Sequence, residues 1–130
     1  MFLAALLMIL LLAVASACGY SASLLLHLPP HAHEMICAAL ICFLSGMLGT
    51  TLTLLGRAAN SQSTLAYAGL FATGFHLVGC LLGAGGVMVT GLAAPVPLLL
   101  WMLPMYWVTL TALVIIIVRM IKSHSHLAGK

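Results

Sequence analysis

Charged side chains are almost absent from this sequence. Of its 130 residues one is acidic and four are Lys or Arg, so charged residues make up 4% of the chain, against roughly 25% in soluble domains. A chain this short that is 65% hydrophobic cannot hide its apolar surface from water, and disordered chains need charge to stay solvated. The net charge of +3 comes from few acids rather than many bases, so we expect no nucleic-acid partner. The composition predicts an integral membrane protein.

Residues for hydrolytic or acid–base chemistry are also scarce. Glu34 is the single carboxylate, which excludes paired-carboxylate catalysis and a calcium or magnesium cage within this chain. The cysteines form no CxxC pair, so neither a disulfide framework nor a thiolate metal site is predicted. We interpret them as small buried packing residues; they are Cys18, Cys37, Cys42 and Cys80. On its own, the chain is not expected to be an enzyme.

Four apolar runs each approach or exceed the roughly 20 residues that a membrane-spanning helix needs. They cover about 3–26, 34–56, 64–90 and 98–121, and a polar tail follows at 122–130. The breaks between them are short, so neighbouring spans must be antiparallel. The predicted fold class is therefore all-α, an up-down four-helix membrane bundle in one transmembrane domain. The alternating ten-residue segments of a membrane β-barrel do not occur.

The first run has one feature of a signal peptide. It ends in the small residues Ala15-Ser16-Ala17 before Cys18, which resemble a cleavage site. No basic segment precedes the run, and we therefore expect a retained helix.

All basic residues fall on one side of a four-span topology. They are Arg57, Arg119, Lys122 and Lys130. Because basic residues gather on the cytoplasmic side of membrane proteins, we expect both termini in the cytoplasm and the protein in the inner membrane. The first connection and the turn Pro95-Val96-Pro97 would face the periplasm. The expected partners are the lipid bilayer and either other membrane subunits or further copies of this chain.

Histidines are the main remaining source of chemistry, and three of them lie in the first connection. His27, His31 and His33 stand beside Glu34, in the stretch HLPPHAHEM. Pro29-Pro30 fit the first turn of the second helix, where His31 and Glu34 would share a face. These residues could ligate haem iron, copper or zinc, with Glu34 as a hydrogen-bond partner of a ligand. Alternatively, they are interfacial histidines that cap a helix.

His76 is different because it lies inside a span, about 16 Å into the membrane at 1.5 Å per residue. An ionisable group at that depth is a functional candidate. It belongs to a face of small residues spaced three and four apart: Gly69, Ala72, His76, Gly79, Gly83 and Gly86. Such a face allows close helix packing, with His76 bonding to another helix. It could equally receive a flat macrocycle, with His76 as the axial ligand and Gly79 beneath the ring.

The second span carries a matching face. Its members are His31, Met35, Ala38, Cys42, Ser45, Gly49, Leu52 and Gly56. The spacing predicts that His31, rather than His33, faces the same seam as the small residues.

The segment 31–35, HAHEM, resembles the second-helix signature of haem–copper oxidase catalytic subunits and of NnrS-type membrane haem proteins. The resemblance covers about half the chain, from the second span through His76. It implies that His31 ligates a low-spin b-type haem with Met35 four residues later, and that His76 supplies the partner ligand. A copper centre is not implied, because its His-His pair is missing. Glu34 also departs from the apolar residue usual in the oxidases.

The expected depths of His31 and His76 in the membrane conflict with ligation of one haem by both histidines, because the two ligands would have to lie at the same depth. His31 would lie roughly 38 Å above the cytoplasmic end of its helix and His76 only about 16–20 Å above that of its own. Two protomers, or two separate sites, would avoid this difference. We therefore expect a small subunit of a respiratory or photosynthetic electron-transfer complex that binds haem b or another macrocycle. The alternatives are a cofactor-free accessory subunit, and a protein that handles copper or zinc at the outer histidines.

Overall fold

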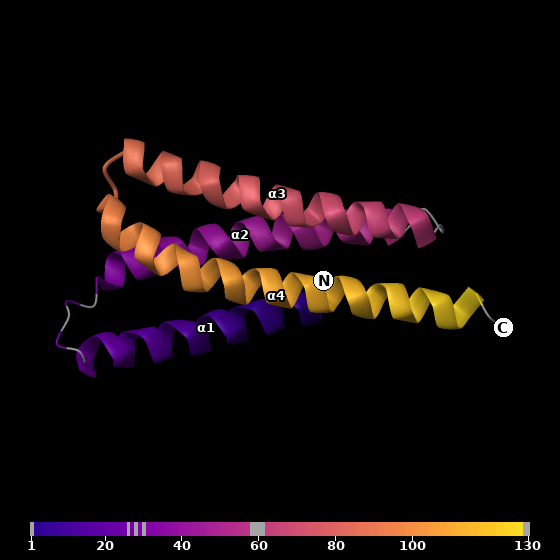
Figure 1. The fold of residues 1–130 in the computed structure, drawn as a ribbon, viewed down its shortest axis with the longest axis horizontal. Coiled ribbons are helices and arrows are strands. Elements are labelled where there is room, and N and C mark those ends of the chain that lie inside the picture. The colour runs from indigo at the N-terminus through magenta and orange to yellow at the C-terminus, as the bar shows by residue number, and fades with distance from the viewer. Residues whose placement is uncertain (1, 26, 28, 30, 58–61, 129–130) are drawn as a thin grey trace.

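In the computed structural model, the described residues are 2–25, 27, 29, 31–57 and 62–128, and they form four helices. These are α1 (Phe2–Leu25), α2 (Ala32–Arg57), α3 (Gln62–Val89) and α4 (Pro95–Ala128). Consecutive helices run in opposite directions (Figure 1). The described part of the chain contains no β-strand. The predicted all-α, up-down four-helix bundle is confirmed.

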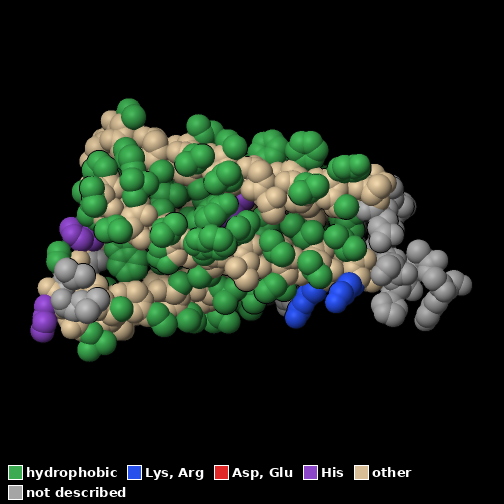
Figure 2. Space-filling model, in the orientation of Figure 1, with side chains coloured by type: hydrophobic (Ala, Val, Ile, Leu, Met, Phe, Trp, Pro, Cys, Tyr) green, Lys and Arg blue, Asp and Glu red, His purple; other side chains and the backbone are tan. Residues whose placement is uncertain are grey.

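Each helix is long and apolar enough to cross a membrane. The crossing segments are Ala5–Leu25, Ala32–Gly56, Ser63–Val89 and Pro95–Lys122. The outward surface of the bundle is rich in large apolar side chains (Figure 2), which in water would be strongly unfavourable. The protein is therefore a multi-pass membrane bundle.

α2 is the central helix, since it packs against α3, α4 and α1, whereas α1 packs against α2 and α4. Small residues let α2 and α3 approach closely, as is usual between membrane helices. A methyl group added to Gly79 would lie 2.8 Å from Cβ of Ser45, and one added to Gly83 would lie 2.6 Å from Cγ2 of Ile41. The part of the predicted small-residue face around Gly79 and Gly83 is therefore filled by α2, whereas Gly69 packs against Ile117 of α4 and Gly86 has open space beside it.

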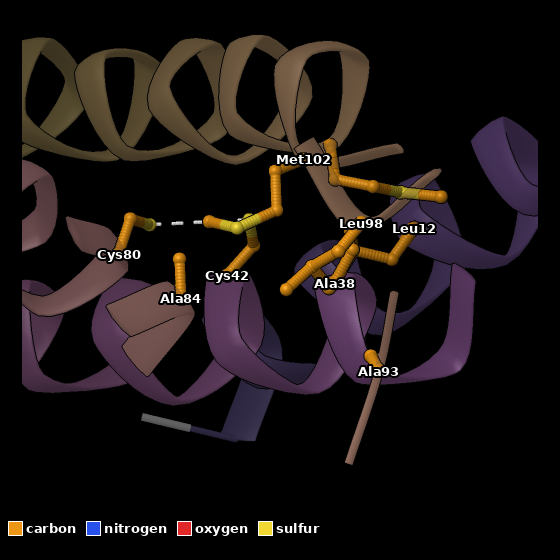
Figure 3. Packing of buried hydrophobic residues seen from close by; sticks show 9 residues of the cluster. Leu12, Ala38, Cys42, Cys80, Ala84, Ala93, Leu98 and Met102 are labelled. Atoms are coloured by element: carbon orange, nitrogen blue, oxygen red, sulfur yellow. Dashed lines mark hydrogen bonds between the residues drawn. The ribbon is translucent and has the colours of Figure 1, made fainter. Parts of the chain in front are cut away.

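Two apolar clusters form the interior. One gathers toward the end of the bundle that carries the α3–α4 turn, and Figure 3 shows it; it comprises Leu12, Ala38, Cys42, Cys80, Ala84, Ala93, Leu98, Met102 and Met105. The other comprises Met8, Ala112, Leu113, Ile116 and Ile117. On α4, Thr109 lies between residues of the first cluster and residues of the second. A polar site thus separates two apolar layers.

The helix boundaries correct two predictions about proline. Pro95-Val96-Pro97 was expected to be a turn, but it forms the first turn of α4, where the missing proline N–H has no helical partner to lose. Pro29-Pro30 was expected inside the second helix, but α2 begins at Ala32 and Pro29 precedes it. Pro30 is outside the described residues.

The fourth helix is longer than predicted. The polar tail was expected to begin after about residue 121, whereas α4 continues through Ala128.

α3 ends in a Schellman motif rather than at its internal glycines. Gly91 has a φ of 69°, a conformation that glycine adopts without strain. Its N–H donates to the carbonyl of Met88 at 3.2 Å, and the N–H of Leu92 donates to the carbonyl of Val87 at 3.1 Å. These two bonds satisfy carbonyls at the helix end. Gly85 and Gly86 remain helical.

Candidate functional site: a buried histidine between three helices

His76, near the middle of α3, is completely buried. Its Nδ1 lies 2.9 Å from Oγ of Ser45 on α2, and its Nε2 lies 2.9 Å from Oγ1 of Thr109 on α4. One imidazole therefore joins three helices. In a bilayer, where no water competes, such bonds satisfy a polar side chain that would otherwise destabilise the fold.

Both hydroxyl groups also contact carbonyls of their own helices. Oγ of Ser45 lies 3.1 Å from the carbonyl of Cys42, and Oγ1 of Thr109 lies 2.9 Å from the carbonyl of Met105. A neutral imidazole offers one N–H donor and one acceptor. All three groups are satisfied when the Ser45 hydroxyl donates to Nδ1, Nε2–H donates to Thr109, and Thr109 donates to Met105. The described residues contain no buried side-chain nitrogen or oxygen without a hydrogen-bond partner.

Two cysteines extend this polar group toward the first apolar cluster. Sγ of Cys80 lies 3.1 Å from Oγ of Ser45 and 3.9 Å from Nδ1 of His76. The same sulfur lies 3.9 Å from Sγ of Cys42, a contact drawn as a dashed line in Figure 3. We call Cys42, Ser45, His76, Cys80 and Thr109 the His76 cluster.

An aromatic ring covers one face of the imidazole. The rings of His76 and Tyr106 are stacked with centroids 5.2 Å apart and planes 7° apart. Near the imidazole edge, a methyl group on Gly46 would lie 3.9 Å from Cε1 of His76. The ring is therefore fixed by packing as well as by two hydrogen bonds.

This environment does not fit a macrocycle ligated by His76. Each ring nitrogen has a hydroxyl partner, and the surface above Gly79 is occupied by Ser45. The nearest groove, between α3 and α4, holds about 180 Å³, which is too small for a flat macrocycle. Of the two hypotheses for His76, the geometry favours the bond between helices.

The prediction that His31 faces the seam of α2 is wrong. His31 precedes α2, has a φ of 41° and keeps 41% of its side chain exposed. Its carbonyl accepts the N–H of Met35 at 3.1 Å, so it starts the helix rather than belonging to it. The prediction fails because α2 begins only after His31, so the His31 side chain does not follow the helical spacing. The inward face of the helix is otherwise as predicted and comprises Met35, Ala38, Cys42, Ser45 and Gly49.

The histidines of the first connection and Glu34 do not form a closed metal site in the part of the chain that the structure describes. Nδ1 of His31 lies 3.8 Å from Oε2 of Glu34, so the two side chains are neighbours although His31 precedes the helix, while His27 and His33 are exposed. Among the residues that the structure describes, no three His, Cys, Asp or Glu side chains converge on a metal position. Met35 is half-buried and packs against the first apolar cluster.

His31 and His76 thus lie in separate environments, one at an exposed helix start and one in the closed interior. The structure does not bring them together as ligands of one iron. Instead, it gives His76 the partners Ser45, Thr109 and Tyr106. Ser45 was on the predicted inner face of the second span; Thr109 and Tyr106 carried only the weak signal of polar groups within an apolar run.

Comparisons with family models, curated protein sequences and solved structures found no match to this chain. The class of this protein accordingly rests on its own fold: an all-α, multi-pass membrane bundle held by a buried interhelical histidine.

Proposed function

We propose that this protein is a small accessory subunit that packs against a transmembrane helix of a larger membrane protein and does not use His76 as a cofactor ligand. The observation that carries the proposal is an apolar hollow on the outer face of α3. It measures about 620 Å³ and is lined by Tyr67, Leu70, Phe71, Gly74, Phe75 and Val78.

The floor of the hollow is glycine. A methyl group on Gly74 would meet nothing within 4 Å, and Tyr67, Phe71 and Phe75 project beside it with 64%, 66% and 48% exposure. A glycine between large side chains lets a neighbouring backbone approach closely, which is the main source of helix association in lipid. The hollow therefore suits an apolar helix, whereas Gly79 and Gly83 are already covered by α2.

The proposal includes an orientation. Basic side chains lie toward one end of the bundle, and the histidine side chains that project from its surface in Figure 2 lie at the opposite end. Arg119 and Lys122, near the end of α4, would face the cytoplasm by the positive-inside rule. Lys130 and the side chain of Arg57 are outside the described residues. In this orientation both termini are cytoplasmic, and His27, His31 and His33 are periplasmic.

Filling the hollow should release the partner. Gly74→Leu is expected to abolish co-purification of a partner with the tagged protein from native membranes, because the new side chain occupies the closest approach. Gly86→Leu is the matched control: it also has open space but lies about 120° around the helix from Gly74. A photo-crosslinking residue at position 71 should label the same partner, and one at the outward Leu48 of α2 should not. Equal partner recovery from both variants would contradict the proposal.

A second candidate function is haem, copper or zinc binding at the outer histidines. It is favoured by a groove of about 400 Å³ beside the exposed His31; the lining residues are Ser23, Pro29, His31, Val96, Pro97, Leu100, Trp101 and Pro104. Here, unlike at His76, an imidazole is accessible beside an apolar wall with an aromatic ring. Such a site would suit the electron-transfer role that the HAHEM resemblance implies.

This candidate predicts that the cofactor follows His31. In protein purified after growth with haem and metals, His31→Ala combined with His33→Ala should remove a Soret band or stoichiometric copper or zinc. His76→Ala should leave them in place. Absorption spectra and elemental analysis provide the measurement. A colourless, metal-free wild-type protein would exclude the candidate. Loss of the cofactor in His76→Ala alone would show that the binding site is at His76 in the interior rather than at the outer histidines.

A further inference from the structure

The two buried cysteines form a pair that links neighbouring helices. Cys42 belongs to α2 and Cys80 to α3, and both are free thiols in the structure. Their sulfur atoms, 3.9 Å apart, are already in contact. A disulfide requires about 2.05 Å between sulfurs, so forming the bond would bring the two sulfur atoms closer by about 1.9 Å.

The His76 cluster supplies a proton route from one thiol. Oγ of Ser45 lies 3.1 Å from Sγ of Cys80 and 2.9 Å from Nδ1 of His76. The Cys80 thiol can donate to the Ser45 hydroxyl while that hydroxyl donates to the imidazole. Since the thiolate is the reactive form of cysteine, a neighbouring base reached through one hydroxyl is what thiol oxidation needs.

A groove leads from the surface between α3 and α4 to Cys80. Its lining comprises Leu77, Cys80, Leu81, Ala84, Leu99, Met102, Leu103 and Tyr106. Cys80 is 3% exposed there, and the leucines on the rim are turned outward. Because these residues lie within membrane-crossing segments, a reactant must be soluble in lipid. The volume of about 180 Å³ suits one ring rather than a macrocycle.

We propose that Cys42 and Cys80 are a dithiol–disulfide pair, oxidised within the bilayer by a lipid-soluble quinone that enters this groove. In the reaction two S–H bonds break and one S–S bond forms. The two electrons and two protons convert both carbonyl oxygens of the quinone into the hydroxyls of the quinol. His76 accepts the Cys80 proton through Ser45 before the proton passes to the quinol. This activity goes beyond the accessory function, and the groove shares no lining residue with the Gly74 hollow.

The test uses the full chain in lipid nanodiscs, with Cys18→Ser and Cys37→Ser to leave only the buried pair. The reduced protein is incubated without oxygen with a short-chain ubiquinone analogue. We expect one quinol per chain by absorbance, and a Cys42–Cys80 linked peptide after blocking of free thiols and mass spectrometry. Water-soluble ferricyanide should oxidise the pair more slowly. Two alkylated thiols after quinone exposure would overturn the proposal, and so would equal rates with both oxidants.

Two further variants, each with a control, test the proton route and the groove. Ser45→Ala keeps both thiols but disconnects Cys80 from His76, and it should slow quinol formation by about 10², the lower end of what a general base contributes, whereas Thr53→Val should not. Leu103→Trp should block the groove and remove most of the initial rate. Val114→Trp, at another outward position of α4, should retain it. Equal rates for Leu103→Trp and Val114→Trp would mean that the groove is not the route. None of these assays requires the partner subunit, so the accessory function can fail without affecting this result.

Discussion

Replacing His76 with alanine should lower the free energy of unfolding by about 2–4 kcal/mol, since it combines a buried cavity with two lost bonds between helices. The imidazole is fully buried, bonds to Ser45 and Thr109, and stacks on Tyr106. Interhelical hydrogen bonds in membranes contribute only about 0.6 kcal/mol each on average, so most of the loss should come from the empty space. Unfolding by SDS in mixed micelles, followed by circular dichroism, measures this change.

Threonine variants separate the hydrogen bond from the cavity. Thr109→Val keeps the side-chain shape but leaves Nε2 of His76 without a partner, which should destabilise the protein by about 1–3 kcal/mol. Thr53→Val is the matched control, since Thr53 is equally buried and donates only to the carbonyl of Gly49 in its own helix. If His76→Ala and Thr109→Val both unfold at the wild-type SDS concentration, the proposed structural role of His76 is wrong.

Replacing Gly79 with leucine should be still more damaging, with a loss of about 3 kcal/mol or more, at the upper end of the range for overpacked interiors. The first added carbon would lie 2.8 Å from Cβ and 3.6 Å from Cα of Ser45. Cβ of Ser45 is bonded directly to the backbone of α2 and cannot rotate away, so relief of the 2.8 Å contact requires the two helices to separate. That movement would also break the contact between Ser45 and His76. We expect either a strongly shifted SDS midpoint or failure to accumulate in the membrane.

Gly85→Leu provides the control on the same helix. A side chain there meets nothing within 4 Å, and leucine favours a helix over glycine by up to about 1 kcal/mol. Gly85→Leu should therefore match or slightly exceed the wild-type stability. Similar losses from Gly79→Leu and Gly85→Leu would show that chain flexibility, rather than the α2–α3 contact, explains the effect.

Several elements followed from local sequence. The apolar runs predicted both ends of α1, α2 and α3 and the start of α4 within a few residues, because span length depends on bilayer thickness rather than on packing. The end of α4 was missed, since the helix continues through Ala128. The small-residue spacing on the third span identified the buried face of α3 around Ala72, His76 and Gly79, since helical period depends on backbone geometry. Gly86, at the end of that face, has nothing within 4 Å of an added methyl group, so the spacing alone did not show where the contact between helices ends.

The outer segment could not be predicted as reliably. Proline fits both the first turn of a helix and the residues before it, and the sequence did not choose between these positions. His31 has a left-handed backbone conformation, so its side chain does not lie on the inner face of α2 as the spacing predicted. The cysteines show a similar limit: Cys42 and Cys80 are buried as expected, but Cys18 faces outward.

By itself, the shortage of charge in the sequence determined that this protein belongs in a membrane, since so few charged groups cannot keep 65% hydrophobic residues in water. The sequence also singled out His76, because an ionisable group within an apolar run needs a partner. Only the tertiary structure decided what that partner is. Ser45 and Thr109 lie 31 and 33 residues from His76 along the chain, and helix packing alone brings their hydroxyls to its two nitrogens.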